Sequence, residues 1–332
     1  MKQILILVVL MPLAISHPGS LNQKEWHSFK LQHGKSYRDK TEELIRKEIF
    51  QENKVRINMH NHRFAMGLEN FKLAINQFTD MYNKEINQMM NAFNIVKNQD
   101  MRGTTFISPE YSTLPESVDW RSKGAVTPVR HQGFKCGSCW ALVTAAALEG
   151  HHFRKTGKLI PLSPQHLLDC SDSYGNQGCK GGWMAEAVAY VKDNGGIATE
   201  YSYPYKGVQG ECKSQNATIG ATSSGFVKIP HGDEKKLAEA VAFFGPVYVS
   251  IDGSHDSFHS YSSDVYREPK CSPRNNSHAA LVVGYGTDSN GTDYWLVKNF
   301  WGTSWGIDGY VKMLRNANNH CGIASFARYP LV

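Results

Sequence analysis

The sequence has no apolar stretch long enough to cross a bilayer, no block of like charges, and no internal repeat or low-complexity segment. A membrane-spanning helix needs about 20 consecutive apolar residues, so we expect no membrane span. The net charge of +6 over 332 residues is small, and lysines and arginines alternate with acidic residues. This balance argues against nucleic-acid binding. The length suits two domains, or one domain with an accessory segment.

Cysteine is absent from the first 130 residues, and all seven cysteines lie in the remainder. This difference predicts a boundary between an N-terminal segment and a larger C-terminal domain. At the start, Lys2 precedes an apolar run from Ile4 to Leu13 and the small residues of Ala14-Ile15-Ser16. The pattern predicts a secretory signal over residues 1–16 rather than a buried core helix. In a secreted chain, an odd number of cysteines leaves at least one unpaired or joined to another molecule.

The N-terminal segment carries one strong helical pattern. Six residues follow each other at steps of three or four and therefore share one helix face: Glu42, Arg46, Phe50, Asn53, Ile57 and Asn61. Glu42 and Arg46 are spaced for an ion pair on that helix. A short strand is expected over residues 71–75, and the mixed polar residues 95–114 are typical of a linker.

The C-terminal domain, which begins near Leu114, changes character along its length. Its first part predicts helices, at residues 139–157, 185–193 and 235–244. After Gly245-Pro246, strand-like segments follow, at residues 247–251, 279–285, 294–297 and 309–314. This order is typical of an α+β domain.

Cys139 lies where a turn runs into an apolar helix. The positive end of the helix dipole favours a thiolate, which is the nucleophilic form of cysteine. A catalytic thiol also needs a nearby base and a group that orients this base. The strands predicted at 279–285 and 294–297 form a hairpin in which residues 278 and 299 would face each other. His278 would then lie beside Asn299, although on this ground alone His278 could equally be an ordinary histidine at a strand end.

With these residues in place, the chain resembles a papain-like cysteine protease proenzyme of the cathepsin L group. Gly137-Ser138-Cys139-Trp140 resembles the family's nucleophile motif, and Cys179-Lys180-Gly181-Gly182 resembles its substrate-binding glycine loop. His278 and Asn299-Phe300-Trp301-Gly302 resemble its histidine and asparagine elements. The helical set from Glu42 to Asn61 resembles the family's inhibitory propeptide, as do the residues that follow it, Ala74, Asn76, Phe78 and Asp80, with Ala74 in place of glycine.

The resemblance implies a papain-like two-lobed fold, with a helical lobe, a β-barrel-like lobe and a helical N-terminal inhibitory propeptide. It divides the chain into a signal peptide (residues 1–16), a propeptide (17–113) and a mature peptidase domain (114–332). It also leaves Cys139 free and pairs the other six cysteines. The implied disulfides are Cys136–Cys179, Cys170–Cys212 and Cys271–Cys321.

The implied activity is that of a cysteine endopeptidase made as a zymogen. Cys139 and His278 would form a thiolate–imidazolium pair that Asn299 orients and Trp301 shields, and Gln132 would help to bind the oxyanion. The implied substrate-binding residues are Gly181, Gly182, Trp183, Met184, Ser250, Ala279, Phe326 and Trp301. The partners would be peptide or protein substrates and the chain's own propeptide, which acid would loosen by neutralising carboxylates such as Asp80. We expect a monomer of the secretory pathway, lysosomal or extracellular, with no cofactor and no metal.

Several positions depart from the family pattern. The segment from Gln132 to Cys136 is one residue longer than usual, so it either bulges outward or moves the Gln132 amide away. Phe300 replaces the serine that follows the asparagine. Trp183 and Phe326 replace smaller residues, so we expect a narrowed second substrate pocket. Glycosylation sequons begin at Asn216, Asn275 and Asn290, and a glycan on Asn275 would crowd the cleft.

These departures also suit another class of protein, a catalytically impaired protease homologue that acts as a binding protein. The complete set of Cys139, His278 and Asn299 favours the enzyme. A third class, a protease inhibitor, applies only if the propeptide acts after separation.

Overall fold

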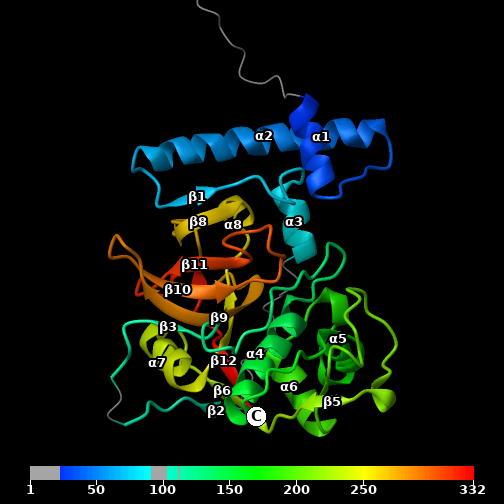
Figure 1. Ribbon diagram of the computed structural model, residues 1–332, viewed down its shortest axis with the longest axis vertical. Coiled ribbons are helices and arrows are strands. Elements are labelled where there is room, and N and C mark those ends of the chain that lie inside the picture. Colours follow the sequence, from blue (N-terminus) through cyan, green and yellow to red (C-terminus); the bar gives the residue numbers. More distant parts are fainter. Residues whose placement is uncertain (1–22, 91–102, 111–112) are drawn as a thin grey trace, which may run out of the picture.

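The computed structural model describes residues 23–90, 103–110 and 113–332 (Figure 1). The signal predicted over residues 1–16 lies outside the described residues, as does part of the predicted linker. Within the described part of the chain, no helix combines the length and the apolar character that a bilayer crossing requires.

Most of the N-terminal segment forms a helical unit at one end of the molecule (Figure 1). Its elements are α1 (Gln23–Gln32), α2 (Lys40–Ala65), β1 (Phe71–Leu73) and α3 (Asn83–Met90), whereas β2 (Thr104–Thr105) lies at the opposite end of the molecule, beside β6. Trp26 and Phe29 of α1 are buried together with Phe50 of α2. These three rings give the unit a small core of its own.

The helix predicted from the six-residue pattern is α2, and its predicted face is the one that packs. Phe50 and Ile57 are buried. Asn53 donates to the carbonyl of Thr79 at 2.9 Å, and Asn61 exchanges hydrogen bonds with the backbone of β1. This face of α2 therefore contacts β1 and the segment that follows it, up to Thr79.

Arg46, on the same face, has a different partner from the one predicted. Its guanidinium makes two hydrogen bonds of 2.8 Å to Glu85 of α3 rather than pairing with Glu42. The Glu42 carboxylate instead accepts a hydrogen bond from the Arg38 amide at the start of the helix. A bidentate arginine–carboxylate pair is the stronger geometry, and it ties α3 to α2.

The helical lobe is built around α4 (Cys139–Thr156), which is buried on all sides from Cys139 to His151. Its residues there are mostly small or apolar, as a helix at the centre of a domain requires. The helix ends at Gly157, whose φ of 74° is the left-handed conformation typical of this position. The surrounding elements are α5 (Pro164–Cys170), η1 (Asp172–Tyr174), η2 (Gly178–Lys180), α6 (Met184–Asp193), β4 (Ile197–Ala198), η3 (Ser214–Asn216) and β5 (Ile219–Ala221).

The second lobe is a ten-stranded, mostly antiparallel sheet. The strands follow the order β1-β8-β11-β10-β9-β7-β12-β6-β2, and β3 also pairs with β9. The remaining strands are β3 (Val118–Asp119), β6 (Gly225–Lys228), β7 (Val247–Ile251), β8 (Tyr261–Tyr266), β9 (His278–Thr287), β10 (Asp293–Lys298), β11 (Tyr310–Leu314) and β12 (Arg328–Leu331). The helices of this lobe that pack against it are α7 (Glu234–Phe244), α8 (Asp256–His259) and η4 (His320–Gly322), and α4 and α6 of the helical lobe contact it as well. The helices and strands predicted for this domain are present, with ends that differ by a few residues.

The N-terminal segment supplies the strand at each end of this sheet. β1 pairs antiparallel with β8, and β2 runs parallel beside β6. Between them, Asn76 donates to the carbonyl of His259 at 2.8 Å, and Gln77 donates to the carbonyl of Trp301 at 2.7 Å. The chain that follows β1 is thereby fixed beside the junction of the two lobes.

Candidate active site

Cys139 is the first residue of α4, and its thiol is buried and free. Ser138 precedes the helix but makes no side-chain capping bond to it, so the positive end of the helix is not neutralised by a cap. The other six cysteines form three disulfides, Cys136–Cys179, Cys170–Cys212 and Cys271–Cys321. These are the pairs that the resemblance implied.

The hairpin of β9 and β10 forms, but its predicted register is wrong. Tyr294 faces Gly286, three residues from the predicted alignment, and an irregularity between Leu296 and Val297 shifts the rest of the pairing by one residue. His278 and Asn299 meet nevertheless, with His278 Nε2 2.8 Å from Asn299 Oδ1. Asn299 lies just beyond the last paired residue of β10, from where a side chain reaches diagonally across the two strands.

This hydrogen bond determines which nitrogen of His278 carries a proton. The Phe300 amide donates to the same Oδ1 at 2.8 Å, which identifies that atom as the oxygen. An amide oxygen only accepts, so Nε2 is protonated and Nδ1 keeps its lone pair in the neutral ring. Nδ1 is buried without a hydrogen-bond partner, and the Trp301 ring lies 4.7 Å from the imidazole. The ring therefore presents a free basic nitrogen, as a general base requires.

Burial keeps Cys139 and His278 uncharged in this state. It raises the pKa of Cys139 to about 11, against the opposing effect of the Ala279 backbone. It lowers the pKa of His278 to about 4, although the hydrogen bond that His278 donates to Asn299 and the Met90 backbone oppose that shift. At neutral pH the covered site therefore holds a thiol and a neutral imidazole. The thiolate–imidazolium pair is disfavoured while the site is covered.

The ring that covers this region is Phe78 of the N-terminal segment. It packs edge-on against Trp301 and Phe134, with centroids 5.2 and 5.9 Å away. It also lies 6.4 Å from the ring of His259, which is buried with neither nitrogen hydrogen-bonded. Burial lowers the pKa of His259 to about 3. No sequence pattern indicated His259, because its environment is created by a residue 181 positions earlier in the chain.

The longer segment after Gln132 bulges outward. Lys135 is exposed, and Phe134 turns towards Phe78. Gln132 stays fully buried, and its side-chain amide donates to the Cys136 carbonyl at 3.3 Å, while its Oε1 has no partner. The extra residue therefore leaves Gln132 inside the site.

Phe300 is accommodated inside the protein. It is buried and belongs to a cluster that also contains Leu142 and Val143 of α4. The ammonium of Lys298 lies 5.3 Å from the centre of its ring. A phenyl ring at this position thus fills the core beside α4, and a buried cation lies over it.

The residues expected to form the second substrate pocket lie on both lobes. Trp183 and Phe326 bring their rings to 6.4 Å, and Ser250 faces Ala279 across β7 and β9. A residue that sequence reasoning missed, Asn276, is buried beside them and hydrogen-bonds with Ser250 Oγ at 3.1 Å. Its one signal in the sequence is its place two residues before His278.

The predicted glycine loop has a steric reason for its glycines. Gly181 has a φ of 123°, which side-chain-bearing residues rarely adopt. A Cβ on Gly182 would lie 2.6 Å from the Trp140 ring. Met184, which begins α6 just after this loop, is buried.

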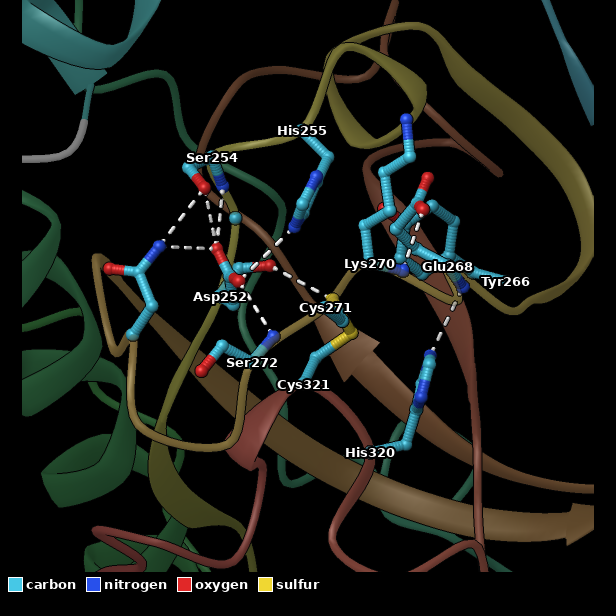
Figure 2. Close-up of a disulfide and its surroundings, with 12 residues drawn as sticks. Asp252, Ser254, His255, Tyr266, Glu268, Lys270, Cys271, Ser272, His320 and Cys321 are labelled. Carbon is cyan, nitrogen blue, oxygen red and sulfur yellow. Dashed lines mark hydrogen bonds and ion pairs between the residues drawn. A yellow bond between two sulfur atoms is a disulfide. The ribbon is translucent and has the colours of Figure 1, made fainter.

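The loop that leads to His278 is held by a disulfide and by one carboxylate (Figure 2). The disulfide joins Cys271 to η4. On the other side, Asp252 accepts hydrogen bonds from the Ser272 amide at 2.9 Å and from the Asn275 side chain at 2.9 Å. The Asn275 amide also donates to Ser254 Oγ at 3.1 Å, so a glycan on this nitrogen would displace one of these bonds.

Figure 2 also shows the groups that most resemble metal ligands. Among the described residues, two sets bring three possible ligand atoms together, Asp252 with His255 and Cys271, and Cys271 with His320 and Cys321. Both sets include sulfur from the disulfide, which is not a thiolate. Neither therefore provides three metal ligands while the disulfide is closed.

Comparisons with known proteins agree with this geometry. A model of the papain family cysteine protease matches residues 114–331, and one of the cathepsin propeptide inhibitor domain (I29) matches residues 26–86. The chain belongs to the papain family of cysteine proteases. It is a cathepsin L-like zymogen of that family, in which the inhibitor domain covers the protease domain.

Relatives in this family match along nearly the whole chain. Cathepsin L1 of Drosophila melanogaster is 54% identical, with 100% of this chain and 92% of the relative covered. Cathepsin L2 of Homo sapiens is 48% identical, with 93% and 92% covered. The structure of digestive procathepsin L 3 from the larval midgut of Tenebrio molitor superimposes with a TM-score of 0.86 at 43% identity, covering 94% of this chain and 100% of that one. The papain-like α+β fold with a helical propeptide region is thereby confirmed.

Iodoacetamide should label Cys139 slowly at neutral pH in the intact zymogen, because a thiol with a pKa of about 11 is ionised in about one molecule in ten thousand. Removal of the propeptide should raise the rate by at least about a hundredfold. Mass spectrometry of the alkylated peptide measures both rates, and Cys139→Ser serves as the unlabelled control. Equal rates before and after removal would contradict a neutral, covered site.

Proposed function

We propose that this papain-family peptidase is an endopeptidase that acts through Cys139, His278 and Asn299 after its propeptide leaves. The observation that carries the proposal is the hydrogen bond from His278 Nε2 to Asn299 Oδ1, which leaves Nδ1 as a free base, while the backbone of the next residue, Ala279, hydrogen-bonds the Cys139 thiol. Once solvent enters, the burial that holds both groups neutral is lost. The proton then moves from sulfur to Nδ1, and the helix start favours the resulting thiolate.

The thiolate attacks the carbonyl carbon of a peptide bond. The carbonyl electron pair moves to oxygen, where the Cys139 amide and the Gln132 side chain donate hydrogen bonds to the negative charge. The imidazolium of His278 then gives its proton to the leaving amine, and the C–N bond breaks. Water, deprotonated by the same ring, releases the acyl group and restores the thiol. Asn299 acts throughout as the group that keeps the ring in place.

We propose residues 1–16 as a signal peptide, 17–113 as the propeptide and 114–332 as the mature domain. The three disulfides support passage through an oxidising compartment. The mature enzyme would be a monomer, lysosomal or extracellular, with peptides or proteins as substrates. It would need neither metal nor cofactor, since the thiol and imidazole suffice for the steps above.

The acid-processed wild-type protein should hydrolyse a fluorogenic peptide, and Cys139→Ala should abolish this activity. Gln132→Ala should lower kcat roughly a hundred- to thousandfold, the usual loss for one oxyanion donor. Lys135→Ala, which changes an exposed residue of the same segment, serves as the matched control and should change kcat less than about twofold. Labelling of Cys139 at an ordinary thiol rate without any turnover would favour the binding-protein alternative.

The second substrate pocket would be narrow and partly polar. Trp183 and Phe326 supply large rings, and the pair of Ser250 and Asn276 supplies hydrogen-bonding groups at its side. Such a pocket favours a small side chain at the second residue before the cleaved bond. His231, whose ring lies 6.2 Å from that of Phe326, supports the aromatic wall from behind.

Phe326→Ala should raise kcat/KM for substrates with a bulky residue at that position about tenfold relative to those with alanine, because removing the ring enlarges the pocket. Paired peptide substrates that differ only at this residue measure the ratio. Phe326→Leu should give an intermediate value. An unchanged ratio in both variants would show that Phe326 does not limit the pocket.

Acid release of the propeptide would involve His259. Asp80, the carboxylate that the family resemblance singled out, is buried between Lys35 and Tyr37 within the propeptide. His259 is neutral and unpartnered beneath Phe78, and it becomes accessible only when that ring leaves. The charged groups that act on it are Arg56 of α2, Asp256 of α8 and, when protonated, His278 of β9.

His259→Leu should move the pH at which the propeptide is removed downwards by about half a unit to one unit. The covered ring has a lowered pKa, so its contribution to propeptide retention is complete above its ordinary pKa of 6.5 and declines as the pH falls below that value. The rate of processing between about pH 4 and pH 7 measures the shift, with the exposed His62→Leu as control. An unchanged profile would leave the carboxylates as the acid-sensitive groups.

A further inference from the structure

A continuous chain of hydrogen bonds connects the residue before Asn299 to the segment before Cys139. Lys298 donates to the carbonyl of Thr127 at 2.7 Å, and the Thr127 hydroxyl donates to Glu149 of α4 at 2.6 Å. Arg130 then bridges two carboxylates, with 3.2 Å to Glu149 and 2.8 Å to Glu200. Glu200 in turn accepts the backbone amide of Tyr205 at 2.9 Å.

Tyr205 is the last residue in this series of hydrogen bonds, and its side-chain hydroxyl has two hydrogen-bond partners. It donates to the carbonyl of Gln132 at 2.8 Å and hydrogen-bonds with Ser138 Oγ. A phenol has a single proton. Because that proton goes to the Gln132 carbonyl, the Ser138 hydroxyl must donate to the phenol oxygen. This use of its proton explains the direction in which Ser138 points and agrees with the absence of a side-chain cap on α4.

The two partners of the hydroxyl lie on either side of the bulge in the longer segment. Gln132 precedes the bulge at Phe134-Lys135, and Ser138 immediately precedes Cys139. One phenol oxygen therefore fixes the separation of these ends, whatever the length of the chain between them. The backbone N–H of Gln132 also donates to the Phe300 carbonyl at 2.9 Å. The backbone of Gln132 is therefore held at its N–H by Phe300 and at its carbonyl by Tyr205.

We propose that Tyr205 is a positioning residue for the oxyanion site, which keeps the Gln132 side chain and the Cys139 amide aimed at one point despite the inserted residue. The inference rests on the proposed function, because it assigns Gln132 to the oxyanion. Burial raises the pKa of Tyr205 to about 12, so the hydroxyl remains protonated throughout the working range of the enzyme. The tyrosine acts through Gln132 and Ser138 and touches no reacting atom.

The test compares Tyr205→Phe with Tyr203→Phe, each expressed as the full-length chain and then processed by acid. Tyr203 lies two residues away, and its hydroxyl also makes a buried hydrogen bond, to Asp169 at 2.9 Å, but it contacts neither Gln132 nor Ser138. Four quantities are measured: kcat and KM for a fluorogenic peptide, the dissociation constant of a peptide aldehyde, and the rate of alkylation by iodoacetamide. When the aldehyde binds, the sulfur of Cys139 adds to its carbonyl carbon and the π electron pair moves to oxygen, so that binding depends on the oxyanion donors. Alkylation displaces iodide at a saturated carbon and uses no oxyanion donor.

Tyr205→Phe should lower kcat about tenfold and weaken the aldehyde about tenfold, while KM and the alkylation rate change less than about twofold. Tyr203→Phe should leave all four values within about twofold of wild type. Equal behaviour of the two variants would overturn the proposal, as would a parallel loss of alkylation, which indicates a general disturbance of α4. If the wild type labels but does not hydrolyse peptides, the proposed function fails while the aldehyde comparison still decides the role of Tyr205.

Discussion

The two lobes are held in register by a buried carboxylate. Glu149 of α4 accepts hydrogen bonds from Thr127, from Arg130 and from the Leu162 amide, and the ammonium of Lys298 lies on the other side of Thr127. Charges in a protein interior are tolerated only when they are paired and hydrogen-bonded. A shift of one of these side chains away from its partners would therefore leave a buried charge without a partner. Since α4 begins at the thiol and β10 runs directly into Asn299, the same hydrogen bonds link the two elements that carry these residues. In the mechanism proposed above, catalysis would depend on charges that never meet a substrate.

Latency in this zymogen is electrostatic as well as steric. The propeptide excludes substrate, but by excluding water it also makes the charged forms of Cys139 and His278 unfavourable. Phe78 of the propeptide region packs against Trp301, and the Trp301 ring lies 4.7 Å from the imidazole of His278. The aromatic contacts of the propeptide thus reach the residue that neighbours His278.

Much of the fold and the site could be predicted from the sequence, because the information was local or carried by a recognisable motif. Helical spacing identified α2, and the motifs around Cys139, His278 and Asn299 identified the family. The hairpin register could not be predicted, since the irregularity after Leu296 depends on neighbouring strands rather than on turn composition. His259, Asn276 and Tyr205 were missed for a related reason. Each is an ordinary residue in its own segment, and it gains importance only from partners that the fold brings from far along the chain.

Removal of the proposed propeptide, residues 17–113, would change the sheet itself. β1 and β2 are the outermost strands of the sheet, and both lie within that segment. The proposed mature domain would therefore have two newly unpaired edges, at β8 and β6, and unpaired edges are where sheets join and aggregate. β8 resists such pairing: its central residues are polar, and Asp264 adopts a φ of 68°, which breaks the regular strand. The β8 edge, which pairs with β1 in the zymogen, would therefore resist pairing with strands of other molecules after the propeptide leaves.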